Sequence, residues 1–175
     1  MKKLEGEDIL RKWRKLRPRR RFPIVAILDD IRSAYNVGSM FRTSACAYIE
    51  ELALCGITPH PPHPKLEKTA LYTVNLVPWK YFTSAKEAIL YYKQKKYKIG
   101  ILEITDISVP VEELSENLFP LAFVVGNEVE GVKDELFPYA DVIFEIPLYG
   151  EKESLNVAVA YGITLFFLIK KVVNL

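Results

Sequence analysis

Hydrophobic and polar residues follow one another in blocks along the chain, and these blocks predict strands and helices in turn. The continuous apolar runs Ile24–Leu28 and Leu121–Val125 are typical of strands covered on both faces. Residues 36–48 and 83–95 instead place apolar side chains at helical spacing, so we expect a helix in each. Further strands are expected at 51–55, 97–104 and 141–146, and a last helix at about 154–173.

This alternation predicts an α/β fold, a parallel sheet with helices on both faces. Ligands of such sheets bind beyond the carboxyl ends of the strands. Three polar segments follow predicted strands there, at 29–36, 126–131 and 147–154. We therefore expect these segments to form any binding site.

Two of the predicted helices begin with polar residues that caps explain only in part. Asn36 and Ser154 are residue types that favour the N-cap position, so we expect them to cap their helices. Arg42 and Asn156 are then polar groups in excess of the caps. An arginine close to an apolar helix face needs a partner, and a carboxylate or a polyanion is the usual one.

The charge of the chain is concentrated at its beginning. The 175 residues suit one domain, with half of them hydrophobic and 26% charged. Residues 1–21 hold ten Lys or Arg against three Asp or Glu, a net +7, whereas residues 22–175 carry fourteen against nineteen, a net −5. Residues 1–21 are thus a basic arm, with a short helix expected at 5–16 and Trp13 and Leu16 as its apolar contacts. Two interpretations are open: the arm binds a polyanionic partner, or it is a solvated tail.

Cysteine, histidine and hydropathy patterns narrow the class of protein. Cys46 and Cys55 lie in apolar surroundings and are expected to be buried, reduced thiols of a cytoplasmic protein. The beginning of the chain lacks an apolar export signal, and the run Val157–Ile169 is too short to span a bilayer. His60 and His63 lie in a proline-rich stretch, 58–64, that predicts a stiff loop; no third metal ligand stands nearby in sequence.

The segment Gly126–Gly131 resembles a nucleotide-binding loop only superficially. It has neither the central glycine of the dinucleotide fingerprint nor the Gly-Lys-Ser/Thr ending of a P-loop. Its glutamates, Glu128 and Glu130, would repel phosphates, so they suit a ligand with hydroxyls or a positive charge. The alternative is a turn in which the two glycines supply special backbone angles.

Taken together, the three polar segments resemble the three motifs of the SpoU (TrmH-like) branch of the SPOUT class of RNA methyltransferases. The first motif reads Asn36-x-Gly38-x-x-x-Arg42, the second begins Gly126-Asn127-Glu128 and leads to Ile146-Pro147, and the third is Ser154-Leu155-Asn156-Val157. They occur in the order of the family and span residues 24–169. The sequence departs from the pattern of the family at three places: Val129 stands where glycine is common, Ala158 where serine is common, and Tyr72-Thr73 where related enzymes have a Gly-Ala pair.

The resemblance implies transfer of a methyl group from S-adenosylmethionine to a ribose 2′-hydroxyl of tRNA or rRNA, with S-adenosylhomocysteine as product and no metal. It also implies a deep C-terminal trefoil knot and a homodimer with sites near the interface. The domain would be residues 22–175. Because no extra folded N-terminal domain is visible beside the arm, tRNA is favoured over rRNA.

Carried over by position, the resemblance gives the residues their roles. The catalytic group is Arg42, supported by Asn36, with Glu128, Ser154 and Asn156 completing the polar site; Gly126, Ile146 and Leu155 contact the cofactor. RNA contacts are expected from the arm and from Arg32, which adjoins the first motif: Arg11, Lys12, Arg14, Lys15, Arg17, Arg19, Arg20, Arg21 and Arg32.

The role of Arg42 has two versions. A guanidinium normally stays protonated, which favours an arginine that orients the hydroxyl and its phosphate and stabilises the developing alkoxide. Removal of the hydroxyl proton by Arg42 is the alternative. At the level of the whole protein, a non-catalytic RNA-binding dimer is the alternative to an enzyme, and the absent glycine fingerprint disfavours a dinucleotide-dependent enzyme.

Overall fold

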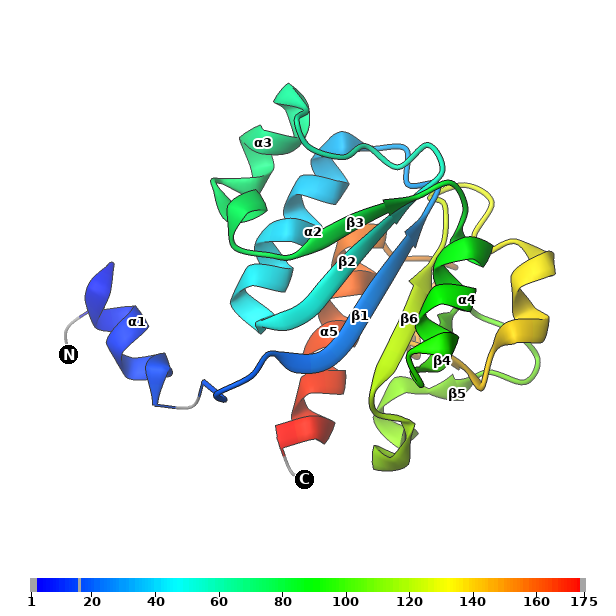
Figure 1. The fold of residues 1–175 in the computed structure, drawn as a ribbon. Helices are drawn as coiled ribbons and strands as arrows, with labels where there is room; N and C mark the ends of the chain where they lie inside the picture. The colour runs from blue at the N-terminus through cyan, green and yellow to red at the C-terminus, as the bar shows by residue number, and fades with distance from the viewer. Residues whose placement is uncertain (1–2, 16, 174–175) are drawn as a thin grey trace.

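The computed structural model describes residues 3–15 and 17–173, and a parallel sheet of seven strands forms the centre of this part of the chain (Figure 1). The spatial order of the strands is β3-β2-β1-β6-β4-β7-β5. Their bounds are β1 Phe22–Asp29, β2 Ile49–Cys55, β3 Trp79–Phe82, β4 Lys98–Leu102, β5 Val109–Pro110, β6 Leu121–Val125 and β7 Val142–Glu145. Every pairing in the sheet is parallel, as the alternating pattern predicts.

Helices cover both faces of the sheet. The α-helices are α1 Glu7–Arg14, α2 Ala34–Ala47, α3 Pro64–Ala70, α4 Ala85–Gln94 and α5 Val157–Val173, and short 3-10 turns lie at Thr73–Asn75, Val111–Glu113, Glu116–Leu118 and Asp134–Tyr139. Helices α2, α3 and α5 pack on one face, whereas α4 and the 134–139 turn pack on the other. The predicted α/β layering is thus confirmed.

The two cores explain why the central strands are apolar throughout. Side chains alternate along a strand, so Ile24 and Phe123 enter the core under α2 and α5, whereas Val25 and Val124 enter the core under α4. All four are buried. A strand that faces two cores needs an apolar residue at every position.

Helix α5 is fixed against α2 and the sheet by one tyrosine. The Tyr161 ring stacks on Phe123, with ring centroids 5.9 Å apart, and its hydroxyl shares a 2.6 Å hydrogen bond with Ser44 of α2. Both polar groups are buried. This contact ties the second turn of α5 to the last turn of α2.

Close packing also requires a glycine in α2. A side chain at Gly38 would collide with Thr69 and with the backbone oxygen of Leu66 in α3. Gly38 therefore serves helix packing, and the first motif contains a structural residue beside its polar ones.

Several sequence-based expectations differ from the structure. Helix α3 and strand β3 were not predicted, because each is short and follows closely on proline residues, Pro61 and Pro62 before α3 and Pro78 before β3. Strand β5, with two residues, was not predicted either. Cys55 is buried as expected, but Cys46 is exposed, because it faces outward from α2.

The basic arm begins with a helix that stands away from the body (Figure 1). Helix α1 is shorter than the expected 5–16 and buries none of its residues, so Trp13 is exposed, not packed; Leu16 lies outside the described residues. The arm is fastened where it meets the sheet. Arg17 and Arg21 both lie over the ring of Tyr48, at 3.8 and 4.6 Å from its centroid.

The carboxyl ends of four strands lie level with one another. Leu28 of β1 pairs with Val125 of β6, Val125 with Leu102 of β4, and Leu102 with Phe144 of β7. The segments that follow these strands therefore leave the sheet at one edge. In the described part of the chain, none of the helices combines the length and the hydropathy that a membrane span requires.

Candidate active site

Glu128 joins two of the motif segments at this edge. Its carboxylate accepts hydrogen bonds from the backbone N–H of Arg32 (2.8 Å), the backbone N–H of Ser33 (3.0 Å) and Nδ2 of Asn36 (3.0 Å). Burial alone would raise the pKa of Glu128, but these three donors outweigh it and hold the pKa below its usual value. Glu128 therefore stays ionised at neutral pH and fixes the loop before α2.

The third segment joins this network through Asn156. Its Nδ2 donates to Oδ1 of Asn36 at 3.3 Å, while its own Oδ1 accepts from the backbone N–H groups of Ala158 (2.9 Å) and Val159 (3.3 Å). Asn36, Glu128 and Asn156 thus form one chain of hydrogen bonds across three distant segments. We call these three residues the motif network.

The caps of both helices differ from the sequence-based expectation. Ser33, not Asn36, caps α2 by accepting from the Asn36 N–H, so the helix starts at Ala34. Asn156, not Ser154, caps α5, which starts at Val157. Asn36 is free to bind Glu128 because Ser33 already satisfies the helix end. Asn156 is the side chain that serves both a cap and the network.

A second tie between the β1 and β6 loops lies beside the first. Lys133 Nζ is 2.5 Å from Asp30 Oδ2 and 3.7 Å from Asp29 Oδ1. Asn127 Nδ2 donates to the backbone oxygen of Asp30 at 2.8 Å. Asp30 adopts a left-handed backbone (φ 51°), and its carboxylate also accepts from the Ile57 N–H at 2.9 Å. These contacts, which we call the lysine latch, fix the loop that carries Glu128.

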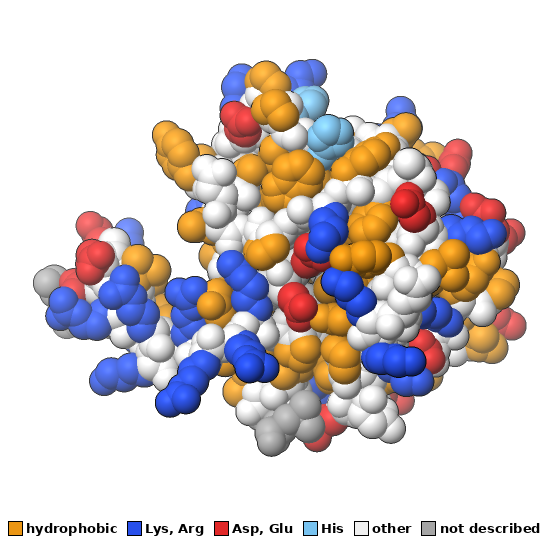
Figure 2. All heavy atoms as spheres, viewed as in Figure 1, with side chains coloured by type: hydrophobic (Ala, Val, Ile, Leu, Met, Phe, Trp, Pro, Cys, Tyr) orange, Lys and Arg blue, Asp and Glu red, His pale blue; other side chains and the backbone are white. Residues whose placement is uncertain are grey.

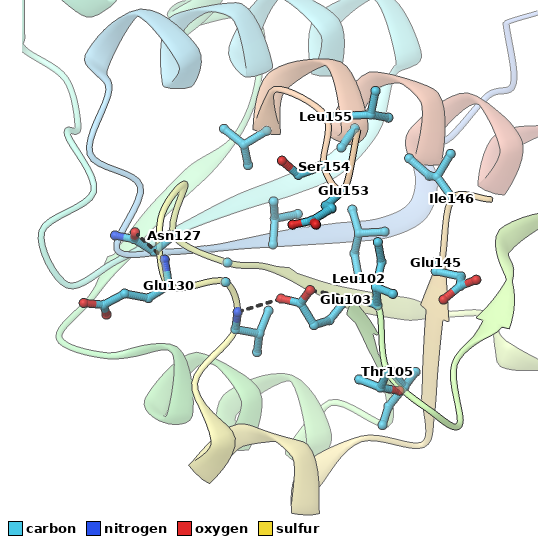
Figure 3. A pocket seen from close by; sticks show the side chains of 18 of the residues that line it. Leu102, Glu103, Thr105, Asn127, Glu130, Glu145, Ile146, Glu153, Ser154 and Leu155 are labelled. Atoms are coloured by element: carbon cyan, nitrogen blue, oxygen red, sulfur yellow. Dashed lines mark hydrogen bonds between the residues drawn. The ribbon is translucent and has the colours of Figure 1, made fainter. Parts of the chain in front are cut away.

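Glu128 and Asn156 of the motif network line a pocket of about 1050 Å³, which Figure 3 shows from close by. Its wall contains four of the sequence-predicted site residues besides the network: Gly126, Ile146, Ser154 and Leu155. A side chain at Gly126 would collide with the backbone of Gly131. The glycine therefore lets the 126–131 loop fold back on itself and form one wall of the pocket.

Sequence patterns did not predict the floor of the pocket, which begins where β4 ends. Glu103 accepts hydrogen bonds from the N–H groups of Val132 (2.9 Å) and Ile104 (3.0 Å). In Figure 3, Glu103 and Glu153 point into the same space from opposite sides. The available signal was the end of a predicted strand at this edge, but no motif marks Glu103.

The pocket is strongly acidic. Seven carboxylate residues line it, and the described residues of its wall include no Lys, Arg or His; the acidic ones are Glu103, Asp106, Glu128, Glu130, Asp134, Glu145 and Glu153. A wall of this charge disfavours phosphates and favours a ligand that carries positive charge and hydroxyls. The expectation drawn from the two loop glutamates thus extends to the whole pocket wall.

Arg42 lies apart from the motif network in this chain. It is six residues beyond Asn36 on α2, about 9 Å along the helix axis. Its side chain is exposed, and within the described residues no hydrogen bond or ion pair holds it. Arg32 is exposed as well, and only its backbone N–H contacts Glu128. The structure thus joins Asn36, Glu128 and Asn156 but not Arg42.

The comparison with protein families agrees with the three motifs. Residues 23–166 match the model of the SpoU rRNA Methylase family, which is most of the chain. The chain therefore belongs to this family.

Curated relatives include enzymes that act on two kinds of RNA. The chain is 28% identical to the tRNA (guanosine(18)-2′-O)-methyltransferase of Aquifex aeolicus over 95% of its own length and 78% of the relative's. It is 27% identical to the 23S rRNA (guanosine-2′-O-)-methyltransferase RlmB of Xanthomonas axonopodis over 82% of its length, but it spans only 57% of that protein.

A solved structure supports the same fold. The AdoMet-bound rRNA methyltransferase of Sinorhizobium meliloti superposes with a TM-score of 0.76 and is 26% identical; the match covers 84% of this chain and 56% of that one. The parallel sheet with helices on both faces is thus shared with a protein crystallised with AdoMet.

Proposed function

We propose that this protein transfers the methyl group of S-adenosylmethionine to a ribose 2′-hydroxyl of RNA. The observation that carries the proposal is the motif network, which unites all three motif segments at the mouth of one pocket. Membership of the SpoU family and two RNA 2′-O-methyltransferase relatives support it.

The pocket suits this cofactor in size and charge. Its volume of about 1050 Å³ accommodates a nucleoside with an amino-acid tail. Its carboxylates complement a sulfonium and an ammonium group, and its strand-end backbone offers donors and acceptors for a purine. The residues that would hold the cofactor are Gly126, Ile146 and Leu155, as the resemblance implies. The bound cofactor supplies the electrophilic methyl group, so the protein chiefly binds, orients and excludes water.

Each member of the motif network would position a part of the site. Glu128 holds the loop before α2, Asn36 and Asn156 bring the two helix starts together, and Ser154 lines the pocket beside them. As the bond between the ribose oxygen and the methyl group forms, the bond from sulfur to methyl would break to leave S-adenosylhomocysteine, and the hydroxyl proton would pass to solvent water. We assign to Arg42 the orientation of this ribose and its phosphate and the stabilisation of the developing alkoxide, because a guanidinium keeps its proton.

Arg42 would take this role in a homodimer. Its distance from Asn36 along α2 separates it from the network of its own chain, so a second subunit would have to bring the two together. The apolar side chains that α5 leaves exposed, Val159, Phe166 and Phe167, support such an interface.

Three further features belong to the proposal. Residues 22–175 would form the methyltransferase domain, and its C-terminal part would form a deep knot. The knot is supported by the pocket, because three separate segments, 102–107, 125–134 and 143–160, line it together. The substrate would be tRNA, since the tRNA relative aligns with more of this chain than RlmB does. The protein would act in the cytoplasm.

Binding and transfer assays test the proposal. We expect calorimetry to show that the protein binds S-adenosylhomocysteine but not NAD or FAD. We expect methyl transfer from S-adenosylmethionine to total tRNA, with the product resistant to alkaline hydrolysis at one site. Arg42→Lys should lower the transfer rate by about a hundredfold, because a point charge does not replace a bidentate fork.

Each alternative predicts a different result. A non-catalytic RNA-binding dimer would bind tRNA without any transfer, and transfer to 23S rRNA alone would overturn the tRNA assignment. Full activity of the Arg42→Lys protein would contradict the role assigned to Arg42. The absence of S-adenosylhomocysteine binding would contradict the proposed function as a whole.

A further inference from the structure

The basic arm and the motif network lie at opposite ends of β1. The arm enters the strand at Phe22, and the network lies beyond Asp29, so roughly 25 Å of extended chain separates them. If the proposed function holds, an RNA that contacts both must cross one side of the molecule. The surface that it crosses should then carry groups that bind nucleotides.

A chain of contacts leads from the arm to the network along the β3 edge of the sheet. Arg21, at the base of the arm, donates to the backbone oxygen of Leu76 at 2.7 Å, just before β3 begins. Near the end of β3, the Tyr81 hydroxyl donates to the backbone oxygen of Gly56 at 3.1 Å. The next residue, Ile57, donates its N–H to Asp30 in the lysine latch.

Three aromatic rings lie on this route, and we call them the edge patch. The His60 ring stacks on Trp79, with centroids 6.1 Å apart and 20° between the planes, and it lies 5.1 Å from the Tyr81 ring. Trp79 and Tyr81 are two residues apart and therefore lie on the same face of β3, which is an edge strand of the described sheet. His60 is exposed and Tyr81 is 47% exposed, although burying these rings would be favourable.

Two exposed lysines, Lys65 and Lys68, lie on α3, which begins four residues after His60. Lys80 lies between the two aromatic residues of β3 but on the opposite face of the strand, where Glu51 pairs with it. Figure 2 shows the histidines and the hydrophobic side chains beneath them on the same face as the Lys- and Arg-rich arm. Aromatic rings interleaved with cations are the surface that single-stranded nucleic acid recognises.

We propose that the edge patch stacks unpaired bases of the substrate RNA and so guides it from the arm to the motif network. Rings bind bases of any sequence through their π-faces, while the lysines contact phosphates. Contacts within the protein position the rings before RNA arrives: the Tyr81 hydroxyl donates to Gly56, and Trp79 packs against the hydrophobic core. The ligand class is therefore a single-stranded or looped segment of RNA.

Paired variants at Tyr81 and His60 test this proposal. Tyr81→Leu and His60→Ala remove stacking rings, and each should weaken binding of a tRNA transcript by roughly tenfold in fluorescence anisotropy. Tyr81→Phe and His60→Phe keep a ring and should bind within about twofold of the unaltered protein. The affinity for S-adenosylhomocysteine should not change in any of the four.

Ultraviolet crosslinking gives a second readout. Nucleotides should be found by mass spectrometry on the peptides that carry His60 or Tyr81. Unchanged RNA affinity of Tyr81→Leu and His60→Ala, together with crosslinks only elsewhere, would overturn the proposal. A protein that binds RNA and cofactor normally but crosslinks elsewhere refutes the edge patch alone, whereas a protein that binds no cofactor refutes the proposed function.

Discussion

At the scale of single residues, Asn156 is the side chain in which folding and the candidate site overlap. Its Oδ1 caps α5 and its Nδ2 reaches Asn36. A sequence pattern assigns an asparagine at a helix start either to the cap or to the site. The side-chain amide can serve both, because its oxygen accepts a hydrogen bond and its nitrogen donates one. Substitutions can separate the two.

We expect Asn156→Ala to lower the free energy of unfolding by about 1 kcal/mol, because the cap is removed. Asn156→Asp keeps an acceptor for the helix, so its stability should stay within a few tenths of a kcal/mol. Both should reduce methyl transfer by tenfold or more, because neither donates to Asn36. Urea denaturation and transfer assays measure the two effects; an Asn156→Asp protein with normal transfer would show that the amide donor is dispensable.

At the scale of elements, the lysine latch holds the loop after β6 to the end of β1. Desolvation raises the pKa of the buried Asp29 above 3.8, and Lys133 opposes this shift. For Asp30, burial also raises the pKa, but the hydrogen bonds from Lys133 and Ile57 outweigh it and lower the pKa. Both carboxylates therefore depend on Lys133 for the stability of their charged forms.

The pH dependence of stability tests this latch. Lys133→Met should cost about 1 kcal/mol near pH 7, a modest value because the lysine is 41% exposed. Without its cation, the buried Asp29 has a pKa that is raised further. The loss in the free energy of unfolding therefore begins above the ordinary pKa of 3.8 and reaches its full value above the raised pKa. The difference from the unaltered protein should therefore shrink as the pH falls towards 4.

A double variant supplies the control for this prediction. Asp29→Asn in the Lys133→Met background removes the buried charge and should recover much of the stability at pH 7. Denaturation curves at pH 4.5 and 7.5 measure both proteins. An equal loss at the two pH values would show that Lys133 stabilises the loop by packing and not by charge.

At the scale of the whole molecule, the arm divides into a free part and a fastened part. Helix α1 buries nothing, whereas Arg21 donates to the backbone oxygens of Ile49 (3.1 Å) and Leu76 (2.7 Å) and lies with Arg17 over Tyr48. Removing all of residues 1–21 would thus disturb the sheet edge as well as the charge. A cut after residue 16 leaves the fastened part in place.

Deletion of residues 1–16 should weaken RNA binding and flatten its salt dependence. The deleted segment holds six of the ten basic residues of the arm, and every phosphate that is no longer neutralised reduces the slope of log K against log salt by about 0.7 to 0.9. The affinity for S-adenosylhomocysteine should not change, since the pocket lies at the far end of β1. Identical salt slopes with and without the segment would identify the arm as a solvated tail.

Local patterns determined much of this fold because they are set by neighbours in the chain. The apolar runs that became β1 and β6 and the alternation that gives a parallel sheet were readable from the sequence. Short elements were not readable: α3 and β3 carry too few residues for a period to show, and contacts with α2 and β2 help to stabilise them.

Sequence patterns alone were enough to predict the layers of the fold, the sheet edge at which the three motif segments lie, and the basic arm. The use of the polar side chains became apparent only in the folded protein. The fold gave the caps to Ser33 and Asn156, it left Arg42 exposed, and it completed the pocket wall with Glu103. This difference arises because a periodic pattern reports which face of an element is buried, whereas a hydrogen bond between Asn36 and Asn156 joins residues 120 positions apart and exists only once the sheet has brought them together.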